Sequence, residues 1–219
     1  MRLPPTPFQL ILFVLILVLL FSLVQIGLLH IAAEKLGISF GQALFALLLC
    51  LLGSVINLPL FTLPMPPDVT PPPYSGWLLG PVNPRPDRII VAVNFGGAIM
   101  PVMFCLYLIA HLQLGQIPLL LAIACVSAVS YFLSRPVQGL GIAMPLFIPP
   151  IVAALCALVF APQHSAAVAY ISGTLGVIIG ADLLRLKQIQ RIGAPVVSIG
   201  GAGTFDGIFL TGIVAVLLA

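Results

Sequence analysis

The stretch "FQLILFVLILVLLFSLVQIGLLHIA", residues 8–32, decides the class of fold. It holds no charged residue, and it exceeds the roughly 20 residues with which a helix crosses a hydrocarbon core. It is also too long for the apolar region of a signal peptide, which covers about 7–15 residues, and no clear cleavage site follows it. The stretch therefore predicts a helix that stays in the membrane.

The rest of the chain has the same character. Of 219 residues, 61% are hydrophobic and 6% are charged, whereas soluble domains carry about 25% charged residues. We therefore expect one integral membrane domain over residues 1–219, in the plasma (inner) membrane, with the lipid bilayer as its main partner. A net charge of +3 without a basic patch argues against binding of nucleic acid.

The apolar runs predict an all-α fold, a polytopic transmembrane helix bundle of about seven spans. The expected spans are 8–32, 40–61, 89–111, 117–134, 145–161, 164–184 and 196–219. With the N-terminus inside, the basic residues on the inner side are Arg2, Arg85, Arg88, Arg135, Arg185, Lys187 and Arg191, and Lys35 alone lies outside. Because basic residues gather in cytoplasmic loops, this map predicts that the N-terminus is in and the C-terminus is out.

Two proline-rich pieces interrupt the apolar runs. Residues 64–88 contain nine prolines and predict a stiff cytoplasmic loop, either a connector or a binding site for a partner. Residues 135–155 mix prolines with glycines and predict a broken helix or a re-entrant turn. Such backbone is stable at membrane depth only where it is buried in protein or lines a cavity.

The candidate site consists of the few polar residues within the spans. Asp182 and Asp206 fall on spans six and seven, where a carboxylate costs about 2.5–3.5 kcal/mol to insert. Asn57 and Asn94 map to the same cytoplasmic half, so we expect them to support the two aspartates. Two alternatives stay open: the asparagines bridge helices by hydrogen bonds, and Asp182 pairs with Arg185.

Glycines accompany the second aspartate. Gly201 and Gly203 precede Asp206, Gly207 follows it, and together they form a candidate backbone motif. Small residues at four-residue spacing also allow helices to pack closely, which is the alternative explanation for these glycines.

Histidines and cysteines form no metal-binding pattern. The three histidines, His30, His111 and His164, map to the outer ends of spans without a spacing motif. The four cysteines stand singly in apolar runs. We therefore expect no bound metal and no cofactor.

Two intramembrane aspartates on adjacent helices, the second after a Gly-x-Gly, resemble the GxGD intramembrane aspartyl proteases: presenilin, signal peptide peptidase and the prepilin peptidases. The resemblance implies that Asp182 and Asp206 activate water to hydrolyse a membrane-spanning peptide. Carboxylates forced close together in a low dielectric cannot both ionise, so one acts as acid and the other as base. This chain departs from the motif, because two extra residues precede Asp206 and Ala181 replaces the tyrosine before the first aspartate.

Over most of its length, through "GADLL", "GGAGTFDGIFLTG" and "AMPLFIPP", the chain is similar to a family of uncharacterised prokaryotic membrane proteins, domain of unknown function 1614. That similarity implies a multi-pass protein and supplies no activity. Three functions remain open. They are an intramembrane aspartyl protease-like enzyme, a proton- or cation-coupled transporter of a small solute, and a non-enzymatic membrane assembly protein.

Overall fold

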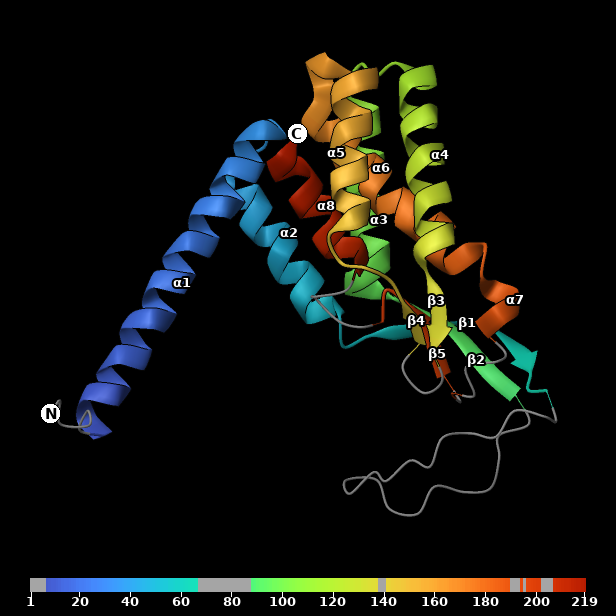
Figure 1. The fold of residues 1–219 in the computed structure, drawn as a ribbon, viewed down its shortest axis with the longest axis horizontal. Coiled ribbons are helices and arrows are strands. Elements are labelled where there is room, and N and C mark those ends of the chain that lie inside the picture. Colours follow the sequence, from blue (N-terminus) through green and yellow to red (C-terminus); the bar gives the residue numbers. More distant parts are fainter. Residues whose placement is uncertain (1–6, 67–87, 138–140, 190–193, 195, 202–206) are drawn as a thin grey trace, which may run out of the picture.

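Helices form most of the computed structural model, which describes residues 7–66, 88–137, 141–189, 194, 196–201 and 207–219 (Figure 1). The α-helices are α1 (Pro7–Lys35), α2 (Phe40–Gly53), α3 (Met100–His111), α4 (Gln116–Leu133), α5 (Ile148–Phe160), α6 (Ser165–Val177), α7 (Leu186–Ile189) and α8 (Gly207–Leu218). Two π-helical turns, η1 (Phe95–Ile99) and η3 (Ile178–Leu183), adjoin α3 and α6, and a 3-10 turn, η2 (Pro162–His164), precedes α6.

A three-stranded sheet lies at one end of the helices (Figure 1). Its strands, in the order β1-β2-β5, are β1 (Asn57–Pro64), β2 (Arg88–Asn94) and β5 (Val196–Ile199). β1 and β2 are antiparallel, and β2 and β5 are parallel. A separate hairpin pairs β3 (Arg135–Val137) with β4 (Gly141–Ala143).

The sheet corrects the expectation of an all-α fold. Expected spans 40–61, 89–111 and 196–219 each contain a strand where a helix was predicted. The strand segments are short apolar runs, which periodicity cannot assign to helix or strand. Isoleucine and valine fill β2 and β5, and such β-branched residues favour strands. Residues 135–155, expected to form a broken helix or a re-entrant turn, contain the antiparallel strands β3 and β4 followed by the start of α5; whether this segment re-enters the membrane stays a prediction.

Within the described residues, three helices are long and apolar enough to cross a membrane: Leu15–Lys35, Gln116–Leu133 and Pro162–Leu183. Shorter apolar helices cover Phe40–Gly53, Phe95–His111 and Ile148–Phe160. The chain thus carries helices of the length and composition of membrane spans, while the number of seven spans and the sidedness stay predictions. The predicted proline-rich loop lies, over residues 67–87, outside the described residues.

Small residues allow α6 to lie at the centre of the bundle, against α4, α5 and α8 (Figure 1). A Cβ added to Gly180 would stand 2.2 Å from the Ser127 carbonyl oxygen of α4, and one added to Gly173 would stand 3.1 Å from Thr211 of α8. Only glycine permits backbones to approach this closely.

The two ends of the bundle differ in their basic residues. Arg88 and Arg135 belong to strands at the sheet end, and Arg185 precedes α7 (Figure 1). Lys35 lies at the opposite end, where its ammonium donates to the carbonyls of Val216 and Leu217 near the end of α8. The three arginines thus lie at the opposite end of the bundle from Lys35, and the predicted positive-inside topology places them on opposite sides of the membrane.

Candidate functional site

The predicted site residues gather where β2 and β5 finish. These strands are parallel, so their carboxyl ends meet at one edge of the sheet, with Asn94 closing β2 and Ile199 closing β5. The chain passes from β2 into η1, and α8 follows β5 in the sequence. In parallel sheets, this edge is where side chains from neighbouring connections converge.

Asn94 holds together a hydrogen-bond network that we call the polar junction, formed by Ser54, Asn57, Asn94 and Ser198. The buried Asn94 amide nitrogen donates to the Ser54 carbonyl at 2.7 Å and to Asn57 Oδ1 at 3.0 Å. Its Oδ1 accepts from the Gly97 backbone N–H at 2.7 Å, which caps η1. The side chain therefore fixes the start of η1 against the end of α2.

Asn57 extends the polar junction across the sheet. It lies opposite Asn94 in the strand register, and its Oδ1 also accepts from the Ser198 hydroxyl at 2.5 Å. The structure thus brings the two predicted asparagines together: they bridge β1 and β2, and Asn94 also links the end of α2 to the start of η1. Sequence reasoning missed Ser198; its signal was a single hydroxyl within the apolar strand "VVSI", directly before two glycines.

Glycines make the polar junction compact. Gly200 has φ +69°, a left-handed conformation that favours glycine. A Cβ on Gly97 would stand 2.1 Å from the Gly200 carbonyl oxygen, and one on Gly201 would stand 2.4 Å from Ser198 Cβ. Gly201 of the candidate backbone motif is therefore needed for the turn after β5.

Asp182 lies in η3, the π-helical turn that follows α6. Its partly buried side chain lines a cavity of about 120 Å³ with Met144, Ala181 and Ile208. Ile208 belongs to the first turn of α8 and comes two residues after Asp206 in the sequence. The cavity therefore joins the helix that carries the first aspartate to the helix that follows the second.

An apolar cluster contributes to the wall of the Asp182 cavity. It consists of Ala98, Val177, Ile178, Ala181, Ile199 and Ile208. Ile199 directly follows Ser198, and Ala181 directly precedes Asp182. Sequence neighbours of both polar features therefore pack in the same apolar cluster.

Arg185 does not depend on Asp182 for its position. Its guanidinium donates to the Ser134 hydroxyl at 2.8 Å, to the Tyr131 carbonyl and to the Gln188 side chain, and it stacks 4.6 Å from the centroid of the Tyr131 ring. These contacts tie the end of η3 to the end of α4.

The other predicted site residues have different standing. Asp206 and Gly203 lie outside the described residues, and Gly207 is the first residue of α8. Among the residues that the structure describes, no three histidine, cysteine or acidic side chains gather to hold a metal ion.

These features define a membrane protein built of apolar helices, with a small sheet and a carboxylate-lined cavity at one end. The chain belongs to the family described as "Protein of unknown function (DUF1614)", whose model matches residues 51–218. No curated protein and no solved structure matches the chain. The family match covers both aspartates and the polar junction.

Proposed function

We propose that this chain is a multi-pass protein of the plasma membrane in which Asp182 and Asp206 act as the acid–base pair of an intramembrane aspartyl protease. The observation that carries the proposal is the cavity of about 120 Å³ that Asp182 shares with Ile208, two residues after Asp206. Asp182 itself lines the cavity. Asp206 directly precedes α8 in the sequence, and Ile208 of α8 lines the same cavity.

The chemistry needs two carboxylates in a low dielectric. Two such groups near each other share one proton, since both cannot ionise. The ionised carboxylate removes a proton from water, whose oxygen attacks the peptide carbonyl. The protonated carboxyl then gives its proton to the leaving nitrogen, so that one water and one peptide bond yield a carboxylate and an amine.

The sheet supports a peptide as substrate. A peptide bond within a helix has its carbonyl and N–H groups engaged, so cleavage requires an extended segment. Among the described residues β5 is an edge of the three-stranded sheet, and it ends at Ile199, shortly before Asp206 in the sequence. An extended peptide can add to such an edge by main-chain hydrogen bonds.

A cleavage assay tests the proposal. The protein, reconstituted in liposomes with a pool of membrane-spanning peptides, should release fragments that mass spectrometry identifies. Asp182→Asn and Asp206→Asn should each lower the rate by about 10²- to 10⁴-fold, as expected for loss of a general acid or base. The double variant should be no slower than the single ones, because the pair acts as a unit.

A matched control separates catalysis from folding. Glu34→Gln makes the same acid-to-amide change at an exposed position at the other end of the bundle, and it should leave the rate unchanged. Melting in detergent should be the same for all four variants. If Asp206→Asn fails to accumulate while Asp206→Leu is stable, Asp206 is a packing residue and the protease proposal is wrong.

A further inference from the structure

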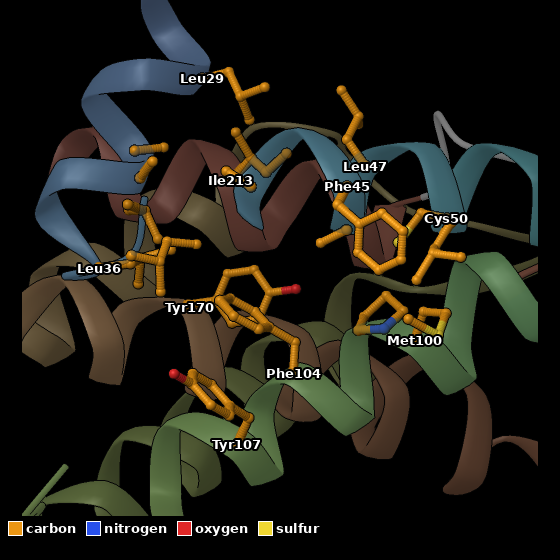
Figure 2. Close-up of a pocket in the computed structure, with 18 of the residues that line it drawn as sticks. Leu29, Leu36, Phe45, Leu47, Cys50, Met100, Phe104, Tyr107, Tyr170 and Ile213 are labelled. Atoms are coloured by element: carbon orange, nitrogen blue, oxygen red, sulfur yellow. The ribbon is translucent and has the colours of Figure 1, made fainter. Parts of the chain in front are cut away.

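An apolar cavity of about 310 Å³ lies between α1, α2, α3 and α8 (Figure 2). Figure 2 shows the side chains of Leu36, which directly follows α1, Phe45 of α2 and Tyr170 of α6 turned toward this space. Ile213 and Val216 of α8 complete the wall. Neither Asp182 nor any residue of the polar junction lines it, so this cavity is distinct from the one that Asp182 lines.

A second cavity of about 310 Å³ lies further toward the end of the same helices, and its lining is polar. Its wall includes Lys35, Gln163, His164 and Ser165, with the acidic Glu34 beside them. Leu36 lines both cavities.

Each shared helix shows the same change from the apolar cavity to the polar one. On α6 the lining moves from Tyr170 to Ala166 and Ala167, one turn nearer the helix start. On α3 it moves from Tyr107 to Leu112, just beyond the end of the helix. The two cavities therefore follow each other along the bundle, apolar within and polar at the end.

We propose that the two cavities form one binding site for an anionic lipid with a single hydrocarbon chain, the chain lying in the apolar cavity and the head group at Lys35. A polar space above an apolar one matches an amphiphile. Asp182 lines neither cavity, and the proposal goes beyond the proposed function.

Volume selects a single chain over a transmembrane helix. A helix about 10–12 Å wide with a pitch of 5.4 Å occupies roughly 400–600 Å³ per turn. The apolar cavity, at about 310 Å³, is smaller than one such turn. A thin hydrocarbon chain fits where a helix of a partner, or of a second copy, does not.

Charge selects an anionic head group. The exposed Lys35 ammonium uses two of its three N–H donors on the carbonyls of Val216 and Leu217, at 3.3 and 3.1 Å. The third can donate to a carboxylate or phosphate oxygen. The Glu34 carboxylate would repel an anionic head group. It also interacts with His30, whose ring nitrogen lies 3.4 Å from the carboxylate.

Photolabelling tests the chain part of the site. The protein in nanodiscs of zwitterionic lipid is titrated with a fatty acid that carries a diazirine in its chain, and labelled peptides are mapped by mass spectrometry. Labels should fall on α2, α3 and α8 beside the cavity. Ala46→Phe places a ring in the cavity. It should raise the fatty-acid concentration at half-saturation by about tenfold or more, because each buried methylene contributes to affinity.

Ala110→Phe is the matched control, since Ala110 is exposed on α3 and does not line the cavity. It should leave the titration unchanged. Equal weakening by both variants, or no weakening by Ala46→Phe, overturns the proposal.

The head-group part is tested with three probes of the same chain: the fatty acid, an alkyl phosphate and the fatty alcohol. Lys35→Gln should weaken the two anions about two- to fivefold, as for an exposed ion pair, and should leave the alcohol unchanged. Lys35→Arg should retain binding, and Glu34→Gln should tighten it. Preference for one anion over the other identifies the head group.

Two results would contradict an anionic ligand. The first is an alcohol that binds as tightly as both anions. The second is a Lys35→Gln variant that weakens all three probes equally, which would mean that its effect comes only from loosening the end of α8.

Discussion

Helices α1 and α6 are both apolar, yet they have opposite surroundings. In the span Leu15–Lys35, 6% of an 18-residue apolar stretch is buried inside the protein, whereas in Pro162–Leu183 the buried share is 78%. The α1 sequence consists mainly of leucine, isoleucine, valine and phenylalanine. The buried α6 sequence, "SAAVAYISGTLGV", is rich in alanine, glycine, serine and threonine.

The difference shows that residue size, more than hydrophobicity, decides which helix lies inside this bundle. Lipid tails are as apolar as leucine, so a large aliphatic side chain gains little by leaving lipid for protein. Small residues gain close backbone contact only inside the bundle. The four predictions below test this contrast by unfolding in detergent or lipid, from the largest expected effect to the smallest.

Gly180→Ala should have the largest effect. The new Cβ would stand 2.2 Å from the Ser127 carbonyl oxygen, a backbone atom that cannot move aside without shifting α4. We expect the free energy of unfolding to fall by about 3 kcal/mol, the upper range for overpacking. Gly27→Ala in α1 is the control, because nothing lies within 4 Å of its Cβ position, and it should be neutral or slightly stabilising.

Ile171→Ala should come next. Ile171 is fully buried in α6, and its replacement leaves a cavity that neighbouring side chains cannot fill. We expect a loss of about 2 kcal/mol, the low end of the range for soluble cores, because the transfer term from water is absent in lipid. Ile171→Val should cost less. An unchanged melting temperature for Ile171→Ala would mean that α6 is less tightly packed than the structure has it.

Asn94→Ala extends the contrast to the sheet end. It would leave the Gly97 N–H and the Ser54 carbonyl without their side-chain partner in a buried place, at a cost of about 1–2 kcal/mol. Asn57→Ala should cost less, since Asn57 is exposed and water can replace its partners. Equal losses for the two variants would contradict the central role of Asn94 in the polar junction.

The length of the apolar runs predicted the spans that are long enough to be helices. Expected spans 117–134 and 164–184 correspond closely to Gln116–Leu133 and Pro162–Leu183. It failed at "RIIVAVN" and "VVSI", because an apolar run of seven or four residues at a helix end reads the same as an extension of that helix. The β-branched residues of these two segments were the available signal for strands. Reasoning from the length of the apolar runs did not use it.

The candidate site was predictable in its composition and not in its geometry. Asn57 and Asn94 were expected in the same half of the membrane, and they meet at 3.0 Å. They meet because they lie opposite each other in the paired strands β1 and β2, and a prediction made of helices alone cannot give that contact. That Asp182 shares one cavity with Asn57 or Asn94 stays a prediction. Whether Asp206 faces Asp182 stays a prediction, because Asp206 lies outside the described residues.

Leu19→Ala should have the smallest effect of the four, and it tests the contrast most directly. Leu19 is 59% exposed on α1, so within a bilayer its neighbours are lipid chains. Removing its side chain leaves no cavity, because lipid fills the space. The change in unfolding free energy should therefore stay within about 0.5 kcal/mol, as for surface positions in general.

The same substitution type at Ile171 is its internal reference, so the ratio of the two effects is more informative than either alone. A Leu19→Ala loss as large as that of Ile171→Ala would mean that α1 packs against protein along its length in the membrane, for example in an assembly with further chains. The contrast between an exposed α1 and a buried α6 would then hold for the isolated chain only. The assignment of α1 as a lipid-facing helix would be wrong.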